Sequence, residues 1–298
     1  MITVISLLLL ATFTLHLLKK RILSFFSNKK LIQHRANQIK ARIAHQKQTH
    51  KNLRLSYNPT NCSSLDRFLP SKMQSPCLFA KQALLWGSSE YNRNESIADN
   101  MLQIIPALCK FTSLAEDENR ALDGFLIEIR GREYGATVGS FAATVRTALS
   151  ALSQHDPSGL DTMQMKSIST SSWYFSFDMV PLFVTTFAPC YPPSSARRLH
   201  LTEEEHNTDS CFILLQPEVS FLRHGIGADH AMTQWQKPKT IRDKIRVHFR
   251  DKKQSYYIPS TLNYPVSTAI VHSEDGKSHS VRFWDKSEYP DKLTMRVA

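Results

Sequence analysis

The hydrophobic and polar positions along the chain predict helices first and strands later. Apolar residues recur at helical spacing over Ile97–Phe111 and Thr137–His155, and the second stretch ends at an Asp-Pro-Ser-Gly turn. Pro76 precedes another apolar stretch, Cys77–Trp86, which predicts a helix that ends before Gly87. The first half of the chain is therefore expected to be mainly helical.

Short apolar runs separated by turns then predict neighbouring strands. They are Phe125–Arg130, Trp173–Asp178, Leu182–Phe187 and Cys211–Gln216. A basic helix over Lys239–Arg250 follows, and then a hairpin built from Val266–His272 and His279–Trp284. Because helices and strands are grouped rather than alternating, the pattern predicts an α+β fold, a single domain with a mainly antiparallel sheet flanked by helices.

The N-terminus predicts a transmembrane helix in front of this domain. Ile2–Leu18 is an uncharged run of 17 residues, and it would span about 26 Å of a hydrocarbon layer about 30 Å thick. A cleaved signal peptide is the alternative, but no basic residue precedes the run and no small-x-small cleavage site follows it. Lys19–Arg21 then places the rest of the chain in the cytosol. We expect a single-pass membrane protein that contacts the lipid bilayer through residues 2–26.

The net charge of +11 comes from the N-terminal part of the chain. Residues 1–65 contain eleven of the 37 Lys and Arg and no Asp or Glu, so the rest of the chain is formally neutral. A neutral domain argues against nucleic acid as a partner. Residues 29–54 predict a basic amphipathic helix, which would lie on anionic lipids or serve as a solvated linker.

The predicted organisation is therefore a membrane anchor over residues 1–26, a basic arm over 27–65 and a folded domain over 66–298. The five cysteines are scattered and form no CxxC pair, which argues against a disulfide framework and a zinc ribbon. The chain has no GxGxxG, GxxxxGK[ST], GxSxG or HExxH motif. Function must therefore be inferred from single residues.

Three residues are candidates for catalysis. Cys77 follows Pro76 at a predicted helix start, where the helix dipole would lower the pKa of a thiol; it is either a reactive thiolate or a buried apolar cysteine. His155 and Asp156 end the long predicted helix. The carboxylate could orient His155 as a metal ligand or a base, or His155 could simply cap the helix.

Two pairs of arginines are candidates for binding an anionic group. Arg197 and Arg198 follow a Pro-Pro-Ser-Ser turn, and Arg242 and Arg246 lie one turn apart on a predicted helix. Guanidinium groups bind carboxylates with two parallel hydrogen bonds, so either pair could hold a carboxylate or a propionate. The alternative for both pairs is a solvated surface.

Six segments taken in order resemble the YqcI/YcgG family. They are Pro76–Lys81, Leu149–Asp156, Trp173–Phe177 with Leu182–Val184, Ala196–Arg198, Leu215–Pro217 and Ile241–Arg246. Together they span about residues 76–284. Characterised relatives in the guanitoxin and D-cycloserine pathways are haem-dependent N-hydroxylases.

The resemblance implies a haem monooxygenase that hydroxylates a nitrogen of a small amine or guanidine substrate. It also implies that protein groups supply an axial ligand and partners for the propionates. His155 and His200 are the candidates for the axial ligand, and the two arginine pairs are the candidates for the propionates.

The sequence also departs from the family pattern. Ser153 and Ala188 stand where the family often has histidines. A second hypothesis is therefore a non-catalytic, membrane-tethered binding or scaffold protein that has lost its haem ligand. A thiol enzyme centred on Cys77 is a third.

Overall fold

The computed structural model of the chain describes residues 33–34, 36–115, 117, 120–200, 209–227, 234–255, 267–275 and 281–290. The chain divides into two units, residues 1–49 and 50–298. In the first unit, residues 36–49 form a mostly exposed helix, which confirms helical structure within the predicted stretch 29–54. The second unit holds the sheet and every candidate site residue.

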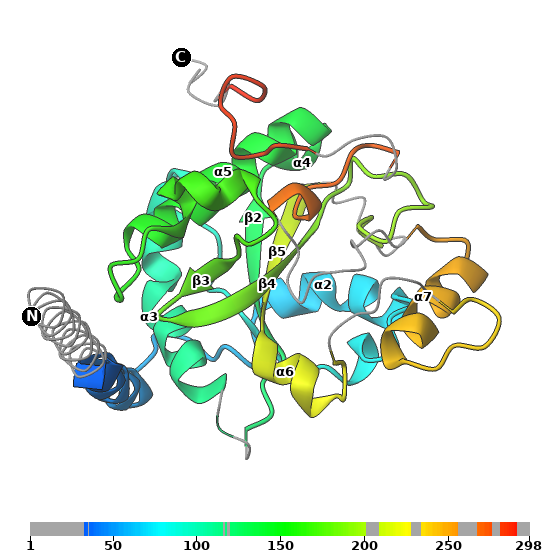
Figure 1. Cartoon of the computed structure of the whole chain (residues 1–298). Helices are drawn as coiled ribbons and strands as arrows, with labels where there is room; N and C mark the ends of the chain where they lie inside the picture. Colours follow the sequence, from blue (N-terminus) through cyan, green and yellow to red (C-terminus); the bar gives the residue numbers. More distant parts are fainter. Residues whose placement is uncertain are drawn as a thin grey trace, which may run out of the picture. The chain divides into compact units, whose positions relative to one another are not determined.

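A five-stranded sheet forms the centre of the second unit (Figure 1). The strands are β1 (Leu85–Gly87), β2 (Gly124–Arg130), β3 (Phe175–Phe177), β4 (Val180–Phe187) and β5 (Ser210–Pro217), in the order β1-β2-β5-β4-β3. Only the β1–β2 pair is parallel; the other three pairs are antiparallel. The predicted α+β fold, a single domain with a mainly antiparallel sheet flanked by helices, is confirmed.

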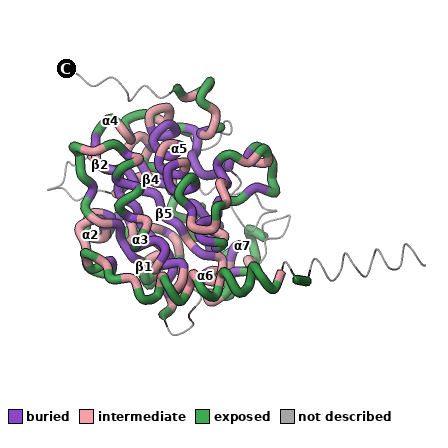
Figure 2. The backbone as a smooth tube through the Cα atoms, turned by 90° about the vertical axis from the view of Figure 1, so that its left-hand side faces the viewer, coloured by how far each residue is buried: buried purple, intermediate pink, exposed green. Residues whose placement is uncertain are grey.

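Two long helices cover one face of the sheet, which we call the first face. They are α3 (Ile97–Ala115) and α5 (Val138–Gln154), and both lie on the left of the sheet in Figure 1. Every second residue of β2 faces them, because side chains alternate along a strand: Phe125, Ile127 and Ile129 are fully buried in the main core. Figure 2 shows the central strands coloured as buried.

The opposite, second face is covered by α2 (Ser63–Gln74), α6 (Glu218–Arg223) and α7 (Ile241–Asp251). In Figure 1, α2 and α7 lie across the sheet from α3 and α5. Leu126 of β2 packs here in a smaller cluster with Phe68 of α2. The apolar packing on this face is incomplete, which leaves room for the site described below.

The remaining elements are short. They are α4 (Arg132–Gly135) and the 3-10 turns η1 (Ala80–Gln82), η2 (Thr162–Gln164), η3 (Lys166–Ser169) and η4 (Ser267–Ala269).

The helix predicted over Cys77–Trp86 is wrong. This stretch forms only the 3-10 turn η1 and then extends into β1, where Trp86 pairs with Phe125. Trp86 is buried in the main core, so tertiary pairing of the strand outweighs the helical spacing of its apolar residues.

The predicted hairpin near the C-terminus is also wrong for the residues that the structure describes. Residues 267–275 and 281–290 contain no strand, and Ser267–Ala269 is a 3-10 turn. The backbone here bonds to distant partners instead of to a second strand: the Tyr191 hydroxyl accepts from His272 N at 3.1 Å, and Thr186 Oγ1 donates to Ile270 O at 2.5 Å.

The predicted transmembrane helix requires a correction. Within the described residues, no helix is both long and apolar enough to cross a bilayer, so a fold preceded by such a helix is not supported. A span requires about 20 predominantly apolar residues, whereas the helix over 36–49 is largely polar. Residues 2–26, to which the span was assigned, lie outside the described residues.

Candidate functional site

A cavity on the second face of the sheet is the candidate site, and we call it the hollow. Its floor is formed by β1, β4 and β5, and its walls by α2, α6, α7 and the loop that contains η1. Its cavity volume is about 170 Å³, and the space open to solvent at its mouth brings the empty volume to about 1140 Å³. Most of its surface is apolar, and aromatic rings predominate among its larger side chains: Phe68, Phe79, Phe183, Phe187, Phe221 and Phe249.

The alternation of β4 explains why rings line the floor. Phe183, Thr185 and Phe187 point to the second face, while Leu182 and Val184 enter the core on the first face. The Phe183 ring packs at a tilt against Phe221 of α6, with ring centroids 5.0 Å apart. The strand pattern therefore supplies an aromatic floor that the helices above it do not fill.

Asp123, directly before β2, organises the polar end of the hollow. Its Oδ1 accepts from Ser220 Oγ at 2.7 Å and is paired with His224 Nε2 at 2.9 Å. Its Oδ2 accepts from the backbone N–H of Leu84 at 2.9 Å. Arg223 Nη2 lies 3.7 Å from Oδ1. This nearly buried carboxylate thus ties the end of α6 to the start of the sheet.

His224 is the imidazole of the hollow. It follows the last residue of α6, and its ring packs on Phe79 with centroids 5.0 Å apart. The hydrogen bond to Asp123 uses Nε2, so Nδ1 is the ring nitrogen that remains for a ligand. A carboxylate behind an imidazole is the arrangement that orients metal-ligating histidines.

Two of the predicted anion-binding arginines, Arg197 and Arg242, line the hollow. Arg197 is 5% exposed, and its guanidinium carbon lies 6.0 Å from the centroid of the Phe187 ring. Arg242 is 9% exposed, and its Nε donates to Gly227 O at 2.8 Å. Lys72 adds a third cation, whereas Asp123 is the one carboxylate among the described lining residues. The surface of the hollow is therefore mainly apolar, and its charged side chains carry a net positive charge.

The other two arginines lie outside the hollow. Arg198 Nη1 donates to Tyr191 O at 2.5 Å. Arg246 is buried on α7, with its Nη1 3.9 Å from Asp243 Oδ1. Each predicted pair is therefore divided by the fold, with one arginine lining the hollow and the other lying outside it.

Cys77 also lines the hollow, but the predicted lowering of its thiol pKa is wrong. No helix starts at this residue, and burial raises the pKa of Cys77 above its ordinary value. A thiol with a raised pKa is a poor nucleophile at neutral pH. Cys77 also lines a neighbouring cleft, so it lies at the boundary between the two cavities.

His155 and Asp156 do not lie in the hollow. They end α5 on the first face, where His155 Nδ1 is 2.9 Å from Ala151 O. Asp156 Oδ1 accepts from the backbone N–H groups of Ser158 and Asp178, at 2.8 and 2.9 Å. Burial raises the pKa of Asp156. The structure thus separates this pair from Cys77 and from the arginines.

His200 lies beside the hollow, in a neighbouring cleft. Its backbone N–H donates to Ser71 Oγ of α2 at 2.8 Å. Partial burial, together with the charge of Arg198, lowers the pKa of His200. In the part of the chain that the structure describes, no group of three or more His, Cys, Asp or Glu side chains is placed to hold a metal ion.

The two departures from the family pattern are both buried. Ser153 Oγ donates to Asp161 Oδ1 at 2.7 Å and accepts from Met163 N at 3.1 Å. Ala188 is fully buried, and its N–H donates to Arg197 O at 3.2 Å.

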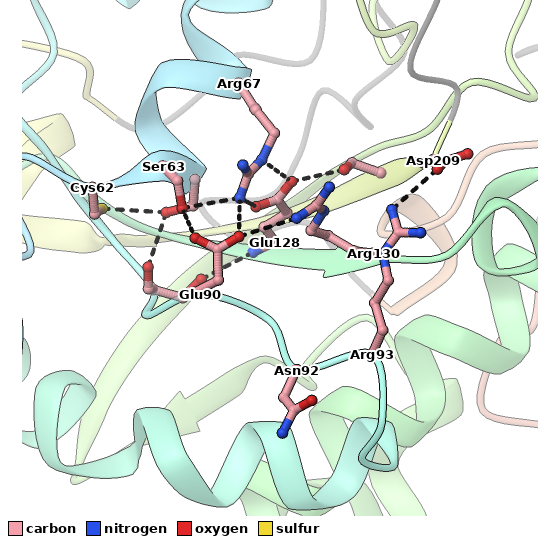
Figure 3. Close-up of polar contacts among 12 residues, drawn as sticks. Cys62, Ser63, Arg67, Glu90, Asn92, Arg93, Glu128, Arg130 and Asp209 are labelled. Carbon is pink, nitrogen blue, oxygen red and sulfur yellow. Dashed lines mark hydrogen bonds and ion pairs between the residues drawn. The ribbon is translucent and has the colours of Figure 1, made fainter.

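A partly buried ionic cluster lies at the other end of the second face (Figure 3). Arg67 of α2 grips Glu128 of β2 with two hydrogen bonds, Nε to Oε1 at 2.6 Å and Nη2 to Oε2 at 2.7 Å. Ser210 Oγ donates to the same carboxylate at 2.7 Å, and Glu90 accepts from both Arg67 and Arg130. These charged side chains form ion pairs with one another. The cluster therefore fixes α2, which forms one wall of the hollow, on the sheet.

A histidine buried near Arg197 makes stability depend on pH. Burial and the Arg197 charge lower the pKa of His272 from its ordinary 6.5 to about 3. Between these values the unfolded chain binds a proton that the folded chain does not, so stability is full above pH 6.5 and falls as the pH drops towards 3. His272→Leu should remove about 1 kcal/mol per pH unit of this dependence below pH 5.5. Urea unfolding from pH 7.5 to 4.5 measures it, and equal slopes for variant and parent would contradict it.

Sequence reasoning missed Asp123 and His224. Neither belongs to a motif: Asp123 precedes a buried strand and His224 follows a short helix. The two residues are a hundred positions apart, and only the pairing of β2 with β5 brings them together.

Comparison with known proteins identifies the family. A model of the YqcI/YcgG family matches residues 66–223, more than half of the chain. The protein therefore belongs to the YqcI/YcgG family, as the ordered segments predicted. The match covers the sheet and α6 and ends before α7. No curated protein matches the chain, and neither does any solved structure.

Proposed function

We propose that this protein is a haem-dependent monooxygenase that hydroxylates a nitrogen of a small amine or guanidine, and that the hollow is its haem site. The observation that carries the proposal is the composition of the hollow. It combines a mainly apolar lining rich in aromatic rings, one imidazole backed by a carboxylate, and two nearly buried arginines.

The side-chain chemistry of the hollow suits this group. His224 would supply a nitrogen ligand, and its hydrogen bond to Asp123 would fix the orientation of the ring. Arg197 and Arg242 would neutralise the two propionate carboxylates, which offsets the cost of burying those charges. When bound, haem supplies the activation of dioxygen for insertion of an oxygen atom into an N–H bond.

The rest of the hollow would position the reactants and exclude water. Phe79 packs on the His224 ring and limits its rotation. Phe183 and Phe221 keep the floor apolar, which strengthens every charge interaction in the hollow. Leu84 N–H and Ser220 Oγ donate hydrogen bonds to Asp123 and so hold that carboxylate in place beside the imidazole.

Titration of the full-length protein with hemin tests the proposal. We expect a Soret band that saturates at one haem per chain, and His224→Ala should shift that band and weaken binding at least about tenfold. His155→Ala, on the first face, and His200→Ala, in the neighbouring cleft, serve as matched controls and should leave the band unchanged. Failure to develop a Soret band would refute the proposal, and a band altered only by His155→Ala would place the ligand on the first face.

A non-catalytic binding protein is the second candidate, and Ser153 and Ala188 favour it. Both positions, where the family often has histidine, are fully buried or bonded within the core. This candidate predicts neither haem uptake nor oxygen consumption with arginine-like amines. Reproducible substrate-dependent oxygen consumption that is lost in His224→Ala would eliminate it.

A further inference from the structure

A second cleft, which we call the groove, adjoins the hollow. The two cavities share Ser75 and Cys77, so the short segment after α2 forms the boundary between them. The groove continues from this boundary to the end of α7 and to His200.

Four basic side chains from separate parts of the fold meet in the groove. Lys81 comes from η1, His248 and Lys252 come from the end of α7, and His200 comes from the segment after β4. None of the described lining residues is acidic. The positive charge of the groove comes from Lys81 and Lys252, and an anionic ligand would pair with it.

The hollow and the groove differ in the surface that they offer to a ligand. The hollow is lined mostly by apolar atoms, whereas about half of the groove surface is polar. We propose that the two together bind an amphipathic anion, with an apolar chain in the hollow and a carboxylate or phosphate head in the groove. This inference is independent of haem, and it names the ligand class that the protein would bind with the hollow free of cofactor.

Fluorescence titration of the full-length protein with dansyl-undecanoate, without added hemin, tests this inference. The dansyl group brightens in apolar surroundings, so saturable enhancement reports entry into the hollow. Lys81→Gln combined with Lys252→Gln should weaken binding about tenfold, because the head group then loses two exposed ion pairs. The methyl ester of the probe, which carries no charge, should bind both forms of the protein equally.

Matched variants separate the head from the tail. Lys166→Gln with Lys239→Gln removes two exposed lysines outside both clefts and should leave both probes unaffected. Ala83→Phe fills part of the hollow and should weaken the acid and the ester alike. Thermal unfolding of each variant checks that the fold is retained.

Competition tests the charge of the head group and separates this inference from the haem proposal. Dodecanoate or dodecyl phosphate should displace the probe, and dodecyltrimethylammonium should not. Equal displacement by the cationic amphiphile, or equal loss of ester binding in the double lysine variant, would overturn the inference. Probe binding without a Soret band supports the amphiphile site alone, whereas a Soret band without probe binding supports haem alone.

Discussion

Replacing Arg67 by methionine should lower the free energy of unfolding by about 3 kcal/mol, because it leaves the buried carboxylate of Glu128 without its main partner. The Glu128 side chain is completely buried, and Arg67 supplies two of its three side-chain hydrogen bonds (Figure 3). Urea unfolding at neutral pH measures the loss. Loss of this pair should also loosen α2, which forms one wall of the hollow.

Arg93 provides a matched control in the same region. It pairs with Asp209 at 3.0 Å, but its side chain is 47% exposed. Solvent screens such a pair, so Arg93→Met should cost less than about 1 kcal/mol. The double variant Arg67→Met with Glu128→Leu should recover much of the lost stability, because neither charge then remains buried alone. Equal losses for Arg67→Met and Arg93→Met would contradict this account of the cluster.

Replacing Asp123 by asparagine should weaken haem binding about tenfold to a hundredfold while haem still binds at the same ligand. Asp123 accepts hydrogen bonds on both oxygens, from Ser220 and His224 on one side and Leu84 N–H on the other. The NH₂ group of an asparagine would face one of these hydrogen-bond donors, so one hydrogen bond would be lost. Stability should therefore also fall, by about 2 kcal/mol. A hemin titration and a urea unfolding curve of the same variant measure the two effects.

Asp156→Asn is the comparison that separates the two effects. Asp156 is also a buried carboxylate that accepts backbone hydrogen bonds, but it lies on the first face. Its replacement should reduce stability and leave haem affinity unchanged. If both variants weaken haem binding to the same degree, Asp123 acts through general stability and does not position His224.

The long elements could be predicted because their signals are local. The helix at Thr137–His155 has a continuous apolar face and a capping box between Thr137 and Ser140, so α5 forms where the pattern placed it. Phe125–Arg130 and Cys211–Gln216 are short apolar runs, and this local pattern is enough to predict a buried strand at each. The error at Cys77–Trp86 has the opposite cause, since a three-residue strand carries too little local signal to compete with a helical pattern.

The candidate site was predicted only in part. Cys77 was selected for its position after Pro76, and Arg197 and Arg242 for their side-chain chemistry; all three line the hollow. His155 was selected from its position beside Asp156, and the fold places both on the other face of the sheet. The type of side chain therefore indicated which residues could bind an anion. Only the fold showed which arginine of each predicted pair lines the hollow.

The sequence by itself determined the family, the α+β class and the main helices and strands, because these depend on local periodicity and on segments kept in order. The tertiary structure decided where the site lies. Asp123 and His224 become partners because β2 and β5 pair in antiparallel register. The hollow exists because the helices on the second face leave the aromatic side of β4 uncovered. Such contacts join residues far apart in the chain, so no local pattern encodes them.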